Sequence, residues 1–345
     1  LGKAEKEFQK FIEKSGIPAA WTILGLSALP TDHPQNVGML GMHGNYGPNV
    51  LTNDCDVLIA VGMRFDDRVT GRLDKYAKQA KIIHLDIDPS EIDKNVKADI
   101  GVWGDCKETL PLLTMAIEQK DRTEWLNVFA DYAQKEYDQC IKPEIYPSSD
   151  IMTMGEVIRV VNEATEGNAI MVTDVGQHQM VTCRYAKFNQ TRSNITSGGL
   201  GTMGFGLPAA IGAKFGALDR TVIAVIGDGG FQMTLQELGT IMQTGIDVKI
   251  MILNNQFLGM VRQWQELFMD KRYSFVDIES PNYVTLAQAY GIGGATVKDR
   301  AALEDAIKTM LAHKGSYLLE VMVGKENNVF PMVPQGCSVS EIRLK

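Results

Sequence analysis

Asp228 and Asn255 carry the clearest indication of chemistry in this sequence. A Gly-Asp-Gly turn around Asp228 closes one apolar run, and an Asn-Asn pair ending at Asn255 closes the next. Carboxylate and amide oxygens suit Mg²⁺, which takes its remaining oxygen ligands from phosphate, backbone and water. Gly229 and Gly230 let backbone N–H groups approach an anion at the start of the following helix. The pattern predicts a site for a magnesium diphosphate.

A strand, a helix and a second strand are needed to position these two tips. The apolar runs 221–226 and 248–253 predict buried parallel strands, and 231–243 is apolar at helical spacing. A right-handed unit of this kind leaves both strand ends on one edge of the sheet. Asp228 and Asn255 would then be neighbours. Gly, Asp and Asn also fill ordinary turns, so a plain turn remains the alternative for this motif alone.

Composition limits the classes of partner. The chain has 345 residues, is 45% hydrophobic and 22% charged, and carries a net charge of −8, typical of two α/β domains. No basic block exceeds two residues, which argues against nucleic-acid or anionic-membrane partners. Five scattered cysteines without a C-x-x-C pair favour a reducing, cytoplasmic setting over disulfides or zinc. We expect no membrane span and no signal peptide.

A linker at 142–150, rich in proline and polar residues, predicts the domain boundary. We expect one domain at 1–145 and another at 151–345, both α/β with mostly parallel sheets because strands and helices alternate. The other elements expected are helices near 4–15, 154–164, 284–290 and 301–312, and strands near 19–24, 57–61, 81–86, 169–173 and 317–323.

A glycine-rich stretch from Gly199 to Gly204 matches G-x-G-x-x-G and precedes an expected helix. This pattern is typical of dinucleotide-binding folds only when a strand comes before it. The preceding segment 192–197 is polar, so we expect no strand there and do not interpret the match as a nicotinamide site. The loop 198–206 is interpreted instead as a place where cofactor and backbone pack closely.

The Gly-Asp-Gly and Asn-Asn pair resembles the thiamine diphosphate motif, and further stretches resemble the catalytic subunit of acetohydroxyacid (acetolactate) synthase. These stretches are 40–44, 64–71, 174–180, 197–212 and 327–334. The resemblance covers nearly the whole chain and implies the family's FAD-binding middle domain followed by its diphosphate-binding domain, each of three layers. The family's N-terminal domain, with its catalytic glutamate, is missing from the match. We therefore expect the chain alone to make no acetolactate.

The resemblance also implies roles for residues of the second domain. The implied metal ligands are the side chains of Asp228 and Asn255 and the backbone carbonyl of Phe257. The implied diphosphate ligands are Gln177, His178 and the amides of Gly229 and Gly230. Met203 is implied to separate the two cofactor rings, although a methionine beside glycines is more commonly core packing.

Met260 and Trp264 lie one helical turn apart and are expected on one helix face. The plain interpretation is core packing. The resemblance instead places Met260 at the cofactor and Trp264 at the acceptor-substrate pocket. There Trp264 would favour an acceptor one methylene larger than pyruvate, an effect limited to roughly 1–3 kcal/mol.

For the flavin, Asp86 at a strand end is a candidate for the ribose hydroxyls. The resemblance adds Met42, His43, Gly62, Arg64, Asp66, Arg68 and Asp105 as FAD-binding candidates. An acidic residue after a strand is common turn chemistry, so FAD is implied by the resemblance alone. Arg68 is also a candidate for the carboxylate of a 2-ketoacid, which a guanidinium binds in bidentate fashion.

The implied activity is decarboxylation of pyruvate and condensation with a second 2-ketoacid, pyruvate or 2-ketobutyrate, in branched-chain amino-acid synthesis. Thiamine diphosphate, Mg²⁺ and FAD are the implied cofactors. A homodimer or homotetramer and a regulatory small subunit are the implied partners. Two alternatives remain: an enzyme like pyruvate oxidase, against which 64–71 and the tail 329–334 argue, and a non-catalytic cofactor-binding module.

Overall fold

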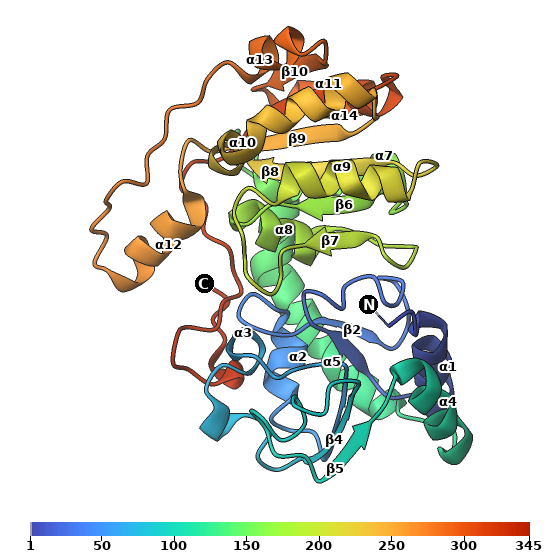
Figure 1. Cartoon of the computed structure of the whole chain (residues 1–345). Helices are drawn as coiled ribbons and strands as arrows, with labels where there is room; N and C mark the ends of the chain where they lie inside the picture. Colours follow the sequence, from blue (N-terminus) through green and yellow to red (C-terminus); the bar gives the residue numbers. More distant parts are fainter. Residues whose placement is uncertain (1) are drawn as a thin grey trace. The chain divides into compact units, whose positions relative to one another are not determined.

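The computed structural model describes residues 2–345 and divides into two compact units (Figure 1). The second unit is Lys142–Val329, and the first contains the residues up to Ile141 together with Phe330–Lys345. This division differs from the expected 151–345 domain at the tail. The tail, Phe330–Lys345, belongs to the first unit. The Val333 N–H donates to Met42 C=O at 2.8 Å, and Ser338 forms an antiparallel β-bridge with Gly71. Among these residues, no helix is long and apolar enough to cross a membrane.

The second unit is built on a parallel sheet with the strand order β10-β11-β9-β8-β6-β7. Its strands are β6 (Ile170–Thr173), β7 (Asn194–Thr196), β8 (Val222–Gly227), β9 (Lys249–Asn254), β10 (Gly293–Val297) and β11 (Tyr317–Met322). Every residue of β6, β8 and β9 is buried. This explains why the central strands read as unbroken apolar runs.

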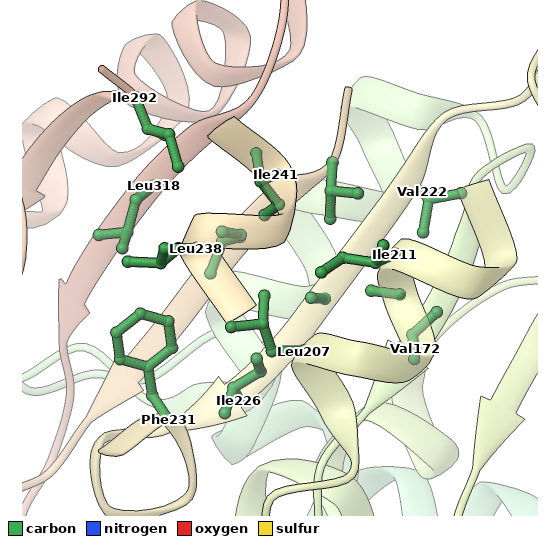
Figure 2. Close-up of a cluster of buried hydrophobic side chains, with 14 of the residues drawn as sticks. Val172, Leu207, Ile211, Val222, Ile226, Phe231, Leu238, Ile241, Ile292 and Leu318 are labelled. Atoms are coloured by element: carbon green, nitrogen blue, oxygen red, sulfur yellow. The ribbon is translucent and has the colours of Figure 1, made fainter. Parts of the chain in front are cut away.

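Helices cover both faces of this sheet. The helices of the unit are α6 (Lys142–Ile145), α7 (Met154–Thr165), α8 (Gln177–Tyr185), α9 (Gly206–Gly216), α10 (Asp228–Thr234), α11 (Leu238–Thr244), α12 (Gly259–Phe268), α13 (Tyr283–Ala289) and α14 (Leu303–Ala312), of which α12 lies beyond the edge of the sheet (Figure 1). Alternate strand residues such as Val222 and Ile226 pack against Leu207, Phe231 and Leu238 from α9 to α11 (Figure 2). Helices α8 and α14 contact the sheet as well, and α7 packs on both of them. The result is the expected three-layer α/β fold.

Two expectations for this unit were wrong. The helix expected at 231–243 begins earlier, at Asp228, and a 3-10 turn at Leu235–Glu237 divides it into α10 and α11. A strand does precede the glycine loop, because β7 pairs with β6 through Asn194–Thr196. A polar strand is tolerated there since β7 is at the edge of the sheet, where only one neighbour pairs with it.

The first unit has two smaller parallel sheets, one of β1 (Ala19–Trp21) with β2 (Asn36–Met39), and one in the order β3-β4-β5. The latter strands are β3 (Val57–Val61), β4 (Lys81–Asp86) and β5 (Ile100–Trp103). The helices are α1 (Glu5–Ser15), α2 (Tyr46–Leu51), α3 (Asp67–Thr70), α4 (Cys106–Ala116) and α5 (Thr123–Glu136). Buried side chains of α1, α4 and β4, including Phe11, Leu110 and Leu85, form one of its cores. The mostly parallel α/β class is confirmed for both units.

Candidate cofactor site

The ends of β8 and β9 bring the two polar tips together. The strands pair in parallel, with Gly227 opposite Leu253. Asp228 directly follows β8 and Asn255 directly follows β9, so both residues leave the sheet at the same edge. The strand–helix–strand arrangement predicted from the apolar runs is confirmed, and α12 follows β9 beyond this edge (Figure 1).

Asp228 is a buried acid that lacks a full set of partners. Its residue is 1% exposed, and its Oδ2 has no hydrogen-bond partner among residues 2–345. Burial raises the pKa of the Asp228 carboxyl to about 7, while the backbone N–H groups of Gly229 and Gln256 act in the opposite direction. A buried carboxylate oxygen is costly unless a donor or a cation reaches it. This oxygen is therefore suited to a bound cation.

Asn255 and Phe257 occupy a tight turn directly after β9. Asn255 is buried, and its Oδ1 accepts the Phe257 N–H at 3.2 Å. An amide oxygen has two lone pairs, so one remains for a ligand. Between them, Gln256 has a φ of 58°, in the left-handed region. Phe257 also bridges Asp277, so the turn is held from outside as well.

Gly229 and Gly230 make a cradle that side chains would fill. A Cβ on Gly230 would lie 2.6 Å from Asp174 Oδ1. A Cβ on Gly229 would lie 2.9 Å from Leu258 Cδ2 and 3.2 Å from Met203 Cε. Met203 thus reaches the glycine cradle, as the resemblance implies for a residue beside the cofactor. Its contact with the cofactor rings stays a prediction.

Asp174 is a site residue to which the sequence analysis gave no role. It is fully buried at the end of β6 and accepts N–H groups from Val175 at 2.8 Å, Gly204 at 3.0 Å and Gly206 at 2.7 Å. It therefore fixes the loop that carries Met203. Because a carboxylate already occupies the amides at the start of α9, they do not serve a dinucleotide pyrophosphate. An aspartate directly after a buried strand was the available signal.

His178 lies against the turn before Asp228, since a Cβ on Gly227 would be 2.8 Å from its Nδ1. It is buried, and its Nε2 has no hydrogen-bond partner in the described chain. Burial lowers the pKa of His178 to about 4, against the opposing charge of Asp174. The imidazole is therefore neutral near pH 7, with a ring nitrogen available to a ligand.

Gln177 links α12 to the turn at 255–257, which we call the metal turn. Its Oε1 faces Asn255 Nδ2 at 3.4 Å, and its Nε2 donates to Gln263 Oε1 at 2.9 Å and to Asn327 C=O at 2.8 Å. Gln263, which the sequence analysis did not single out, is fully buried and accepts the Val329 N–H at 2.9 Å. A glutamine on the apolar face of a helix was its only sequence signal.

Met260 and Trp264 both lie on α12, which confirms that they share a helix. The Trp264 ring packs on Phe268, with centroids 5.0 Å apart and planes tilted by 48°. This ring contact fits core packing as well as a pocket wall. The acceptor pocket stays a prediction.

In the first unit, the flavin candidates gather at one sheet edge. Asp86 is the last residue of β4, and Gly62 and Asp105 follow the ends of the neighbouring strands β3 and β5. Met42 N–H donates to Arg68 C=O at 2.7 Å, which brings the Met42–His43 loop to α3. The topology thus collects residues that are far apart in sequence.

Each acid of this group already has a structural partner. Asp66 Oδ1 accepts the Arg68 N–H at 3.1 Å and Asp105 Oδ1 accepts the Lys107 N–H at 2.9 Å, so these two residues cap α3 and α4. Asp86 Oδ1 accepts the Asp88 N–H at 2.9 Å.

The two arginines of this group lie near the surface. Arg64 Nε lies 4.0 Å from Asp66 Oδ2, and the Arg68 side chain is 66% exposed. FAD binding here, and the role of Arg68 toward a 2-ketoacid, stay predictions.

Comparison with known proteins agrees with both units. Residues 1–113 match the central domain of thiamine pyrophosphate enzymes, and 174–321 match their C-terminal TPP binding domain. The chain is 40% identical to the acetolactate synthase isozyme 2 large subunit of Escherichia coli over 100% of this chain and 62% of that protein. It is 42% identical to the Lactococcus lactis acetolactate synthase large subunit, over 97% of this chain and 58% of that protein.

A plant protein, the chloroplastic acetolactate synthase 1 of Nicotiana tabacum, is 41% identical over 99% of this chain and 52% of its own length. The chain thus spans between half and two thirds of these relatives. The matched cofactor domain contains the unpartnered Asp228 oxygen, the Asn255 turn and the glycine cradle, which together fit a magnesium diphosphate. By its two matched domains, with relatives similar along its whole length, this chain belongs to the thiamine pyrophosphate enzyme family.

Proposed function

We propose that the protein is an acetolactate synthase catalytic chain, which decarboxylates pyruvate and joins the product to a second 2-ketoacid, pyruvate or 2-ketobutyrate. The observation that carries the proposal is the buried Asp228 oxygen without a partner, beside Asn255 and above a glycine cradle. The similarity to acetolactate synthases supports the choice of substrates.

The residues of the second unit would divide the work of holding the cofactor. Asp228, Asn255 and the Phe257 carbonyl would hold Mg²⁺, while Gln177, His178 and the amides of Gly229 and Gly230 would bind diphosphate oxygens. When bound, thiamine diphosphate supplies the nucleophilic carbon that attacks the 2-ketoacid carbonyl. Met203, fixed by Asp174, would orient the cofactor rings and exclude water from them.

The finer parts of the proposal concern FAD and the partners. FAD would bind at the β3, β4 and β5 ends, at the residues of the first unit named above, and Met260 would lie against the thiamine cofactor. Arg68 would bind the 2-ketoacid carboxylate. A cytoplasmic homodimer or homotetramer with a regulatory small subunit completes the proposal.

Calorimetric titration with thiamine diphosphate, in Mg²⁺ and in chelator, tests the cofactor site. We expect binding to weaken at least about tenfold in chelator, because the diphosphate charge then lacks its cation. Thiamine without its diphosphate is the control ligand and should bind weakly in both conditions. Equal affinity for thiamine diphosphate with and without the metal would contradict the proposal.

Trp264→Leu tests the substrate choice in an enzyme of the family's full length. Enlarging the pocket should lower the preference for 2-ketobutyrate over pyruvate as acceptor, by an amount within the roughly 1–3 kcal/mol of one methylene. Competition between the two acceptors measures the product ratio. An unchanged ratio would return Trp264 to core packing on Phe268.

A further inference from the structure

Glu320 is a buried acid in the middle of the second unit's sheet. It lies on β11, an otherwise apolar strand, and is 8% exposed. Both carboxylate oxygens are used: Oε1 accepts from Asn254 Nδ2 at 2.7 Å and Oε2 accepts from the Thr296 hydroxyl at 2.8 Å. Burying an acid in a sheet gives little net stability compared with apolar residues of similar size. Its place therefore points to a role in orienting a neighbour.

The neighbour that Glu320 orients is Asn254, the first residue of the Asn-Asn pair. Glu320 is opposite Ile252 in the pairing of β11 with β9, and Asn254 follows on the same face two residues later. With its Nδ2 held by Glu320, Asn254 presents Oδ1 to the Gln256 N–H at 3.0 Å. An unbroken path of hydrogen bonds thus leads from β11 into the metal turn.

This path of hydrogen bonds ends at Gln256, whose backbone conformation it supports. Its left-handed φ of 58° is a conformation that is unfavourable for a residue with a Cβ. The hydrogen bond from its N–H to Asn254 offsets part of that cost. Asn255 and Phe257 lie on either side of it, so the conformation of Gln256 determines where the Asn255 side chain and the Phe257 carbonyl are presented.

We infer that Glu320 is a positioning residue for the metal turn: it holds Asn254, which holds Gln256 in the conformation that presents Asn255 and Phe257 to Mg²⁺. The inference rests on the proposed cofactor site. Glu320 does not itself reach the metal in this scheme, and it acts through the side chain of Asn254.

The test compares Glu320→Ala, Glu320→Gln and a matched control, Ser316→Ala. Ser316 is equally buried and directly precedes β11, where its hydroxyl donates to Ile246 C=O and accepts the Val248 N–H. Removing it should lower stability without touching the metal turn. For each variant, thiamine diphosphate is titrated over a series of Mg²⁺ concentrations, and thermal unfolding of the ligand-free protein is recorded.

Glu320→Ala should raise the Mg²⁺ concentration needed for half-maximal binding by about tenfold, the lower end of the usual effect of removing a group behind a metal ligand. Glu320→Gln keeps an oxygen for Asn254 and an amide for Thr296, so it should stay within about threefold of the original protein. Ser316→Ala should lower the unfolding temperature and leave the Mg²⁺ requirement unchanged. Combining Glu320→Ala with Asn254→Ala should add little to Asn254→Ala alone, because both act along one path.

Two results would overturn the inference while leaving the cofactor site intact. One is a Mg²⁺ requirement in Glu320→Ala that matches Ser316→Ala, which would make Glu320 only a structural residue. The other is a Glu320→Gln variant as impaired as Glu320→Ala, which would assign the effect to charge. Metal-independent binding in the unmutated protein would instead contradict the proposed function itself.

Discussion

Acidic residues follow strand ends in both units, but their surroundings differ. In the first unit, Asp86 and Asp105 accept backbone N–H groups two residues ahead, as turn and cap residues do. In the second unit, Asp228 is 1% exposed and keeps one oxygen without a partner in the described chain. Position after a strand is therefore shared by both kinds of acid. Burial without a full set of partners is what distinguishes the candidate ligand.

Asp228→Asn should produce the largest effect, and in two opposite directions. Losing the carboxylate should weaken Mg²⁺-dependent thiamine diphosphate binding by at least about a hundredfold, since a direct ligand is removed. The ligand-free protein should gain about 1–3 kcal/mol of stability near pH 8, because a buried charge without a full set of partners is gone. Calorimetry and chemical unfolding measure the two quantities.

Asp86→Asn is the matched control in the first unit. Its amide oxygen still accepts the Asp88 N–H, so stability should change by no more than about 0.5 kcal/mol and Mg²⁺ dependence should not change. If Asp86→Asn gained as much stability as Asp228→Asn, the missing partner of the Asp228 oxygen would not explain the gain.

Glu144 tests whether a raised carboxyl pKa alone marks a ligand. Burial raises the pKa of its carboxyl to about 7, although its Oε1 already accepts the Gly155 N–H at 3.1 Å. A raised carboxyl pKa contributes stability that is complete below about pH 4.5 and is lost as pH rises through about 7. The neighbouring Arg184 opposes the shift and Glu156 reinforces it.

Between about pH 5 and pH 8, the unfolding free energy of Glu144→Gln should therefore fall by about 1–2 kcal/mol less than that of the unmutated protein. Unfolding curves across this range check it, with the unmutated protein as reference. The Mg²⁺ requirement should be unaffected. A change in metal dependence would show that a partly buried acid with a backbone partner also belongs to the site.

Asp105→Ala should have the smallest effect, about 1 kcal/mol of lost stability, because it removes the N-cap of α4. Glu108→Ala, in the same first turn, is the control and should cost less. Chemical unfolding measures both. If FAD affinity falls in Asp105→Ala while stability does not, Asp105 is a ligand rather than a cap. Candidate ligand acids would then occur in both units.

The strands show where sequence patterns are informative. The central strands β8, β9 and β11 appear within one residue of the expected limits, because neighbours on both sides and helices on both faces demand continuous apolar residues. The edge strands β7 and β10 were not predicted. Their residues are only partly buried, and they need hydrogen bonds from one neighbour only, so polar and glycine residues suffice.

For the candidate site, the sequence predicted the types of the polar residues and their place at strand ends, because apolar runs closed by Asp228 and by Asn255 emerge at one edge of a parallel sheet. Which buried polar atoms are left without a hydrogen-bond partner depends on the folded structure. Asp174, Gln263 and Glu320 bind partners from distant segments, and no local spacing encodes such contacts. Hydrogen bonds between segments depend on how whole elements pack, so the scaffold behind the ligands becomes visible only in the folded chain.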